Sequence, residues 1–508
     1  ELKIMKKILS AMLALTLTMG GLMGCKKDET ADNSNGVTLK WIMLGSKQKD
    51  ADMVLSAFNE KLAEYLPDTK VDVEFIDGGD YQEKWNLMMA SNESVDIAWS
   101  GYAVDFMSQI QQGSYIELND LIDKYGQDMK EELPDWLFDL GAVNGKIYCV
   151  PNYQMMASWP QGVKVLKEYS DQYLDKDALN KAWEEAKTDI NGVKKEYEIW
   201  GKFFESLKNA GKIGNGIDVS SFGNFGNNNV IDKTTVSGYS IDLNTMKVVC
   251  DEESETTKLW YETVADWFKK GYIRSDILTV EGLGTEPYKN GYVAWQHNWC
   301  DKTAEIESGE LGVEVDAIKM GYDPMIKNII PVTSTVIART SKNPERAMQF
   351  INLMNSEKGK DLYNLIVWGI EGKHYTKKDG IRIEVPYNTM QATSDEDYGL
   401  MNWAVGNIKN SYEPQATISG WADYVYDIDT KAKISPVLGF RPETSKIATQ
   451  IAQVSAVRGE YQKTLKYGAA DNEQALYEEY INKLKTAGSD KIIEELQTQL
   501  DEWLKAKD

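Results

Sequence analysis

The sequence predicts an α/β protein with two domains, and three observations support this fold class. The chain has 508 residues, which is too long for a single hydrophobic core and suits two domains. Its first hundred or so residues alternate β-rich runs with amphipathic helical runs, an order typical of a parallel sheet covered by helices. Residues 461–508 have helical periodicity and predict a C-terminal helical extension.

The β-α-β-α-β order occupies the stretch that follows residue 36. VTLKWIMLG (37–45), KVDVEFI (70–76) and DIAWSG (96–101) predict strands, and the segments between them predict helices. Parallel sheets bind ligands in crevices outside the carboxyl ends of their strands. We therefore expect binding residues just after Leu44 and just after Ala98.

A hairpin is predicted where Asn144 and Gly145 separate two extended runs in AVNGKIYCVPNYQ (142–154), and Pro151 is expected to end the pairing. Residues from about 160 to 325 are mainly helical in pattern and predict a second domain. The run NIIPVTSTVIARTSKNPERAMQFINLM then predicts a strand followed by a helix. That helix has an N-cap at Asn343, Pro344 in its first turn, and a buried stripe of Ala347, Phe350, Ile351 and Met354.

The N-terminal residues have the plan of a secretory signal. Lys6 and Lys7 precede the apolar run Ile8–Met19, which is too short to span a membrane. LMGC (22–25) looks like a bacterial lipobox and predicts a signal peptide at 1–24 with lipidation of Cys25; a plain signal peptide with a chance cysteine is the alternative. Residues 25–36 lack apolar periodicity and predict a flexible tether. We expect the protein on the outer face of the bacterial cytoplasmic membrane, held there by its lipid.

Charge and cysteine usage exclude several classes of partner. The formal net charge of −23 repels phosphate backbones, so we expect no nucleic-acid partner. Cys149, Cys250 and Cys300 are too few for a disulfide framework, although two of the three could form a single disulfide bond. No CxxC pair is present, and His297 with Cys300 lacks a third ligand or an orienting group. We therefore expect no metal and no cofactor.

Several runs carry a resemblance to a known family. NGKIYCVPNY, TSTVIARTSKNPERAMQFINLM and NLIVWGIEGKHY resemble the solute-binding lipoproteins of bacterial ATP-driven (ABC) importers, the group that includes oligosaccharide-binding proteins of family 1. The C-terminal run from GFRPETSKIATQIAQV to IIEELQTQLDEWL is similar to the helical extension of one lipoprotein subset. The resemblance covers nearly all of the chain after the tether. It is specific for fold and transport role but does not identify the solute.

The resemblance implies a two-lobe fold of the periplasmic-binding-protein type (type II), with a hinge between the lobes and a ligand held between them. It implies an ABC permease as the membrane partner, and we expect a monomer. We place the first lobe at 37–153 with about 328–365, the second at about 154–327 with 366–460, and the extension at 461–508.

Aromatic composition favours a sugar as the ligand. The chain has 27 Tyr and 15 Trp against 11 Phe, so flat rings with a polar edge dominate. Such rings suit pyranoses, which present C–H faces to stack on and hydroxyl rims to hydrogen-bond. We therefore predict an extracellular oligosaccharide as ligand. For a binding protein of the same kind, a peptide or a polyamine is the alternative ligand. A surface adhesin that holds a glycan without importing it is a third hypothesis.

Candidate ligand residues follow from strand ends and from the runs shared with the family. Trp99 and Tyr102 follow a predicted strand, and the family has an aromatic residue there; Ser46, Lys47 and Gln48 follow the first strand. For each aromatic candidate, the alternative to a ligand-binding role is that of an ordinary core residue. The remaining candidates are Trp295, Gln296, Asn298, Trp299, Asn152, Tyr153, Trp368, Trp403 and Arg441.

A membrane-anchored glycan hydrolase is the rival from a different class. It needs two carboxylates across a cleft, one of them with a raised pKa. The 79 acidic residues of the chain include no recognisable catalytic run, and no phosphate-binding glycine loop is present. We therefore predict a non-catalytic binding protein with no catalytic residues.

Overall fold

The computed structural model describes residues 36–157, 161–219, 230–280, 288–298, 308, 311–319, 323–387, 391–415 and 417–507. Residues Val37–Asp508 form one compact unit. The predicted signal peptide, the lipidation site Cys25 and all but the last residue of the tether lie outside the described residues, as do Trp299 and Cys300. No helix in the described part of the chain is long and apolar enough to cross a membrane.

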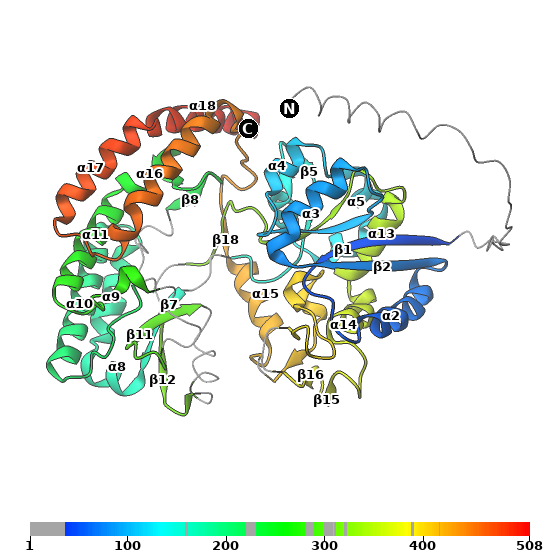
Figure 1. Cartoon of the computed structure of the whole chain (residues 1–508), viewed down its shortest axis with the longest axis horizontal. Coiled ribbons are helices and arrows are strands. Elements are labelled where there is room, and N and C mark those ends of the chain that lie inside the picture. Colours follow the sequence, from blue (N-terminus) through cyan, green and yellow to red (C-terminus); the bar gives the residue numbers. More distant parts are fainter. Residues whose placement is uncertain are drawn as a thin grey trace, which may run out of the picture. The chain divides into compact units, whose positions relative to one another are not determined.

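The first lobe is built on a five-stranded sheet in the order β2-β1-β3-β14-β6. Figure 1 shows β1 and β2 side by side in this sheet. β1 is parallel to β2 and β3, whereas β14 is antiparallel to both β3 and β6. The first three strands lie within one residue of their predicted bounds, which confirms the β-α-β-α-β reading. The strands are β1 (Val37–Leu44), β2 (Thr69–Ile76), β3 (Ile97–Gly101), β6 (Val150–Pro151) and β14 (Thr333–Ile337).

Helices cover both faces of this sheet, and the alternation along β1 shows why. Leu39, Trp41 and Met43 enter the core that contains α2 (Ala51–Tyr65). Ile42 and Leu44 point to the opposite face and enter the core that contains α3 (Gly78–Ala90). Because successive strand residues face opposite sides, the unbroken apolar run from Trp41 to Leu44 requires cover on both faces.

The predicted hairpin is present as β4 (Ala142–Val143) and β5 (Lys146–Ile147). Asn144 and Gly145 both have positive φ, 52° and 77°, as a two-residue turn of this type requires. β6 ends at Pro151 on the edge of the sheet. Proline has no N–H, and at an edge position the sheet does not need that hydrogen-bond donor.

Late residues complete the first lobe. α13 (Pro344–Asn355) begins after Asn343 as predicted, and its apolar stripe is buried. The Asn343 side chain makes no cap hydrogen bond; its Nδ2 donates to Asp96 at 3.4 Å instead. α14 (Lys360–Trp368) packs in the same core.

One expected boundary differs from the structure. We expected residues 366–460 in the second lobe, but buried residues from Ile366 to Ile408 pack with β1 and α2 in the first core. Val437 and Phe440 are the first of the later residues to join the second core. The apolar stripe of a helix shows that it is buried but does not show which core it enters.

The second lobe has two small sheets and a helical, aromatic-rich core. One sheet has the order β11-β7-β12 and the other β10-β9-β8. α10 and α11 supply Trp200, Phe203, Phe204, Trp260 and Trp267 to the core. The elements are β7 (Gln161–Leu166), α8 (Lys167–Tyr173), α9 (Lys176–Ala186), α10 (Ile190–Asn209), β8 (Ile231–Lys233), β9 (Tyr239–Asp242), β10 (Lys247–Cys250), η2 (Asp251–Glu253), α11 (Glu255–Lys269), η3 (Ile277–Thr279), β11 (Ala294–Asn298) and β12 (Val315–Lys319).

Three C-terminal helices pack into this second core, with α16 beside α11 (Figure 1). The predicted break at Gly488 is confirmed, because it separates α17 (Glu473–Thr486) from α18 (Ser489–Lys507). α16 (Ala448–Lys466) begins before residue 461, so the helical extension starts earlier than expected.

The other elements are short. They are α4 (Phe106–Gln111), α5 (Asn119–Tyr125), α6 (Gln127–Glu132), α7 (Asp135–Leu140), β13 (Met325–Ile326), η4 (Glu357–Gly359), β15 (Thr376–Asp379), β16 (Arg382–Glu384), η5 (Asn402–Ala404), η6 (Ile408–Asn410), β17 (Glu413–Pro414), α15 (Trp421–Lys431), β18 (Lys433–Ile434) and η7 (Ser445–Ile447).

Candidate functional site

Polar side chains follow the carboxyl ends of β1 and β2, where the topology predicts a binding edge. The Ser46 hydroxyl, after β1, donates to the carboxylate of Asp77, after β2. Lys47 is exposed and forms an ion pair with Asp52 at 2.6 Å. Parallel strands end at the same edge, so these groups form one polar rim.

Tyr102, after β3, is the exposed aromatic residue at this edge. Its side chain is 61% exposed. The ring meets the edge of Trp99 (centroids 5.3 Å, planes 75° apart) and lies 6.3 Å from the half-buried ring of Trp403. The Tyr102 N–H donates to the carbonyl of Val332 at 3.1 Å, and Val332 is itself 50% exposed. The result is a small apolar platform that carries a free hydroxyl.

Trp99 lies beneath this platform and is only 2% exposed. Its indole N–H donates to Thr333 Oγ1 at 2.7 Å, and its carbonyl accepts from the Tyr81 hydroxyl at 2.7 Å. Both faces of its strand are covered, so Trp99 has no free ring face on which a ligand can stack. We assign it to the support of Tyr102.

The side-chain amides of two candidates, Asn152 and Gln48, form hydrogen bonds within the protein. Asn152 is buried; its Nδ2 donates to Thr333 Oγ1 and the Ala404 carbonyl, and its Oδ1 accepts from Thr335. Gln48 clamps a distant loop, because its amide exchanges hydrogen bonds with both the N–H and the carbonyl of Gly399. These side chains position the edge and have no exposed group for a ligand.

Tyr153 is buried, and its backbone pairs with Gly406 and Ile408. Below it, the carboxylate of Asp429 on α15 accepts hydrogen bonds from the N–H groups of Met156 and Ala157. Burial raises the pKa of Asp429 to about 6, against the effect of those N–H groups. Tyr153 and Asp429 therefore fix the segment that leaves the first lobe.

Three further candidates are core residues. Trp368 and Trp295 are each 2% exposed, and the Trp295 ring is covered in part by Tyr288. Arg441 is 4% exposed; its guanidinium donates to the carbonyls of Leu140 and Ile329, and burial lowers its pKa to about 10. Only the backbones of Gln296 and Asn298 are described; they pair with β7.

Sequence reasoning missed the aromatic residues of α15, of which Trp421 and Tyr424 form one aromatic face and Tyr426 lies on another side of the helix. The rings of Trp421 and Tyr424 stack with centroids 5.8 Å apart and planes 25° apart. Tyr426 is 37% exposed, and the Lys409 ammonium lies 4.1 Å from its ring centre. The buried carboxylate of Glu413 accepts from the Gly420 and Trp421 N–H groups and so fixes the start of the helix. The signal was present as three aromatics within WADYVYD.

The buried titratable groups with raised pKa values lie in separate places in the described part of the chain. Glu196 and Asp429 have raised pKa values, about 7 and about 6, because each carboxyl is buried in its own core. Burial also raises the pKa of the Cys149 and Cys250 thiols to about 12. Among the residues that the structure describes, no group of three or more His, Cys, Asp or Glu side chains is arranged to hold a metal ion.

Comparison with known proteins agrees with this arrangement. Residues 53–220 match the model of the family described as bacterial extracellular solute-binding protein, and residues 436–505 match a domain of unknown function. A carbohydrate ABC transporter substrate-binding protein of Streptococcus pneumoniae serotype 4 (strain ATCC BAA-334 / TIGR4) is 26% identical over 98% of this chain and 97% of its own length.

Solved structures show the same fold. The crystal structure of the N-glycan transport solute binding protein NgtS from Streptococcus pneumoniae has a TM-score of 0.74 at 24% identity, and the match covers 93% of this chain and 100% of that one. The same protein in complex with Man5GlcNAc has a TM-score of 0.61 at 24% identity, over 93% and 99% of the two chains. The predicted two-lobe α/β fold is confirmed.

Proposed function

We propose that the chain is a bacterial extracellular solute-binding protein, which captures an oligosaccharide between its two lobes and delivers it to the permease of an ABC importer. Two facts about similar proteins support this ligand class. The relative that matches almost the full length is a carbohydrate-binding transport protein, and NgtS has been solved with Man1GlcNAc and with Man5GlcNAc.

The observation that carries the proposal is the exposed ring of Tyr102 at the carboxyl edge of the sheet. Its face offers apolar area to the C–H face of a sugar, and its hydroxyl is an exposed hydrogen-bonding group. The neighbouring Ser46 and Asp77 are short polar groups of the kind that bond sugar hydroxyls. The aromatic face of α15 is a second place for rings to stack, which suits a ligand of several sugar units.

The proposal places the protein outside the cytoplasm, with a lipid on Cys25 and a polar tether up to residue 36. A tether of this composition holds a folded body near the membrane without fixing its orientation. Delivery to a permease is the part of the proposal that rests on the similarity to this family. The chain acts by binding, and we assign it no catalytic step.

A ligand screen tests the proposal. The full chain is heated with mannose-containing N-glycan fragments and other oligosaccharides, with peptides and polyamines as parallel panels. A ligand present at 100 times its Kd adds about 2.7 kcal/mol to the stability of the folded state, which produces a measurable rise in the melting temperature. Stabilisation by a glycan that isothermal titration then confirms supports the proposal. Stabilisation by amines or peptides alone overturns the sugar assignment and leaves the fold and the family unchanged.

A further inference from the structure

A short segment connects the first lobe to the C-terminal helices, and we define this strap as residues 436–443. It follows β18, which pairs with β13. Leu438 packs in the first core, whereas Val437 and Phe440 pack in the second. The strap therefore contacts the cores of both lobes.

Helix α18 holds the far end of the strap through a glutamine and a tryptophan. The Gln499 side chain pairs with the backbone of Glu443: its Nε2 donates to the carbonyl at 2.8 Å, and its Oε1 accepts from the N–H at 2.7 Å. Four residues later, the Trp503 ring meets the ring of Phe440 edge to face, with centroids 5.8 Å apart.

The same stripe of α18 continues to the start of the strap. Lys507, four residues beyond Trp503, donates from Nζ to the carbonyl of Pro436 at 3.3 Å. One turn before Gln499, Glu495 forms an ion pair with Lys446 at 3.2 Å. Because helix residues four apart lie on one face, α18 follows the strap along its whole length in the opposite chain direction.

On its other side, Arg441 ties the strap to the first lobe. The buried guanidinium donates to the carbonyl of Leu140, at the end of α7, at 3.1 Å. It also donates to the carbonyl of Ile329 at 2.8 Å and to the side-chain oxygen of Asn328, on the segment after β13. The Asn328 amide returns a hydrogen bond to the carbonyl of Phe440 at 2.9 Å. Asn328 also donates hydrogen bonds to Asp232 and Lys233 of β8, so it contacts the second lobe as well. The strap is thus fixed to α18 on one side and, through Arg441, to the Leu140 carbonyl of the first lobe on the other.

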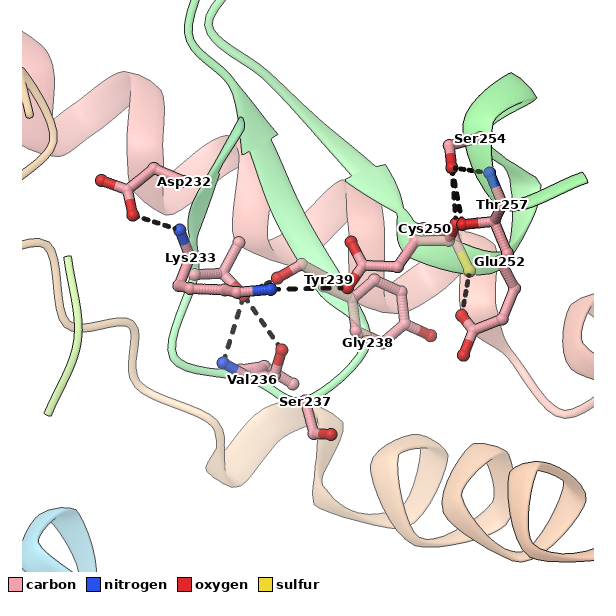
Figure 2. A network of polar contacts seen from close by, with 12 residues as sticks. Asp232, Lys233, Val236, Ser237, Gly238, Tyr239, Cys250, Glu252, Ser254 and Thr257 are labelled. Atoms are coloured by element: carbon pink, nitrogen blue, oxygen red, sulfur yellow. Dashed lines mark hydrogen bonds and ion pairs between the residues drawn. The ribbon is translucent and has the colours of Figure 1, made fainter. Parts of the chain in front are cut away.

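The C-terminal helices are in turn anchored in the second lobe. Arg458 on α16 forms a bidentate pair with the carboxylate of Glu252, at 2.8 and 2.9 Å. Figure 2 shows Glu252 beside the β8–β10 sheet, where it also accepts from the Cys250 thiol at 3.1 Å. The Arg458 guanidinium bonds the carbonyls of Ser237 and Gly238 in the turn between β8 and β9. α16 is therefore anchored to this sheet.

A groove of about 630 Å³ separates the end of α18 from the first-lobe hairpin. The hairpin contributes Asn144 and Gly145, and α18 contributes Trp503 and Lys507. Close packing is therefore absent at this point, which leaves the hairpin room to move relative to α18.

We infer that the C-terminal extension, residues 436–507, is a brace on the hinge that limits how far the two lobes can separate. Wide separation requires either the α18 contacts with the strap or the contacts of Arg441 with the first lobe to break. Small rotations need neither, because the groove provides space. The inference concerns the hinge and does not depend on which ligand the protein binds.

Two glutamines of α18 provide a matched test. Gln499→Ala removes two hydrogen bonds to the strap. Gln497→Ala removes two hydrogen bonds to the backbone of β10 and the turn before it, at Val248 (2.8 Å) and Met246 (3.1 Å). Both variants lose the same kind and number of contacts on the same helix, but only Gln499 contacts the strap.

The lobe separation is measured in the ligand-free full chain by pulsed electron paramagnetic resonance. Nitroxides are attached at Glu83→Cys on α3 and Lys181→Cys on α9, both exposed positions in different lobes. Cys25 and Cys300 are replaced by Ser in every sample, whereas Cys149 and Cys250 are buried and are retained.

The brace predicts that Gln499→Ala broadens the distribution toward distances absent from the parent, while Gln497→Ala leaves the distribution unchanged at a similar loss of melting temperature. An unchanged distribution in Gln499→Ala overturns the inference, and so does equal broadening in both variants. No ligand is used, so either result is independent of the ligand screen.

Discussion

Tyr102 is the residue on which the ligand assignment depends most, and its exposure allows a clean test. Tyr102→Ala removes the platform and should weaken glycan binding about tenfold, because an aromatic contact contributes about 1 kcal/mol beyond its buried area. The folded state should lose little stability, since most of the ring is already in water. Titration calorimetry measures the affinity, and thermal unfolding measures the stability.

Leu87→Ala is the matched control for this prediction. Leu87 is also 61% exposed, but it lies on α3, away from the strand ends. We expect an unchanged affinity in this variant. Equal weakening by both substitutions, or none by Tyr102→Ala, contradicts the role of Tyr102.

Asp429 predicts a pH dependence of stability. Its pKa of about 6 in the folded protein lies above the value near 3.9 of an unfolded chain, because burial disfavours the charge. The folded state therefore binds this proton more tightly, so the contribution is fully present below pH 4 and is lost as the pH rises through 6. The loss is about 3 kcal/mol by linkage.

Asp429→Asn keeps an acceptor for the Met156 and Ala157 N–H groups and removes the titration. Between pH 4 and pH 7, we expect the variant to gain stability relative to the parent by up to this amount. Urea unfolding at several pH values measures it. If the free energies of unfolding of the two proteins change in parallel with pH, Asp429 is not the source of the pH dependence.

At the scale of elements, the buried pair Arg458–Glu252 joins α16 to the β8–β10 sheet. The two side chains are 11% and 4% exposed. Arg458→Met leaves the carboxylate buried without its partner and should destabilise the protein by about 3–5 kcal/mol. Urea unfolding of the full chain measures this loss.

A second variant separates the ion pair from packing. Arg458→Met combined with Glu252→Gln removes the unpaired charge and should recover part of the lost stability. If the double variant is no more stable than Arg458→Met, the loss comes from packing of the arginine and not from the charge.

Local pattern was sufficient to predict many elements but not the roles of their side chains. The three parallel strands, the Asn144–Gly145 turn and the helix after Asn343 were predictable because each depends on neighbouring residues. The role of Trp99 was not, because β3 is buried on both faces and has no alternation that distinguishes core from crevice. Asn152 and Gln48 follow strands as ligand residues do, but their partners lie far away in the sequence, at Ala404 and Gly399.

At the scale of the molecule, two lobes joined by a braced hinge predict compaction on binding. A ligand that contacts both lobes favours the closed state by its difference in affinity for the two states. Small-angle scattering of the full chain should show a smaller radius of gyration with a saturating glycan. A tightly bound glycan that leaves the scattering curve unchanged contradicts hinge closure.

The number of lobes was predictable from the chain length and from the strand and helix, now β14 and α13, that follow the second-lobe residues in sequence but belong to the first lobe. The boundary was not, since the apolar residues from Ile366 to Ile408 indicate burial without indicating which core they enter. The brace could not be predicted from the sequence either. Gln499, Trp503 and Lys507 have helical spacing, but nothing in their order identifies the strap as the surface they contact.

The place of β14 in the first sheet has a consequence for biosynthesis. This strand lies between β3 and β6, yet the ribosome makes it long after both of them. At about 5–20 residues per second, translation from Pro151 to Thr333 takes roughly 10–40 s. During that interval β3 and β6 lack the strand that joins them, and their unpaired edges are open to aggregation. The proposed export of the protein delays pairing further, so the chain should need protection by a chaperone until β14 has been made and can pair with both strands.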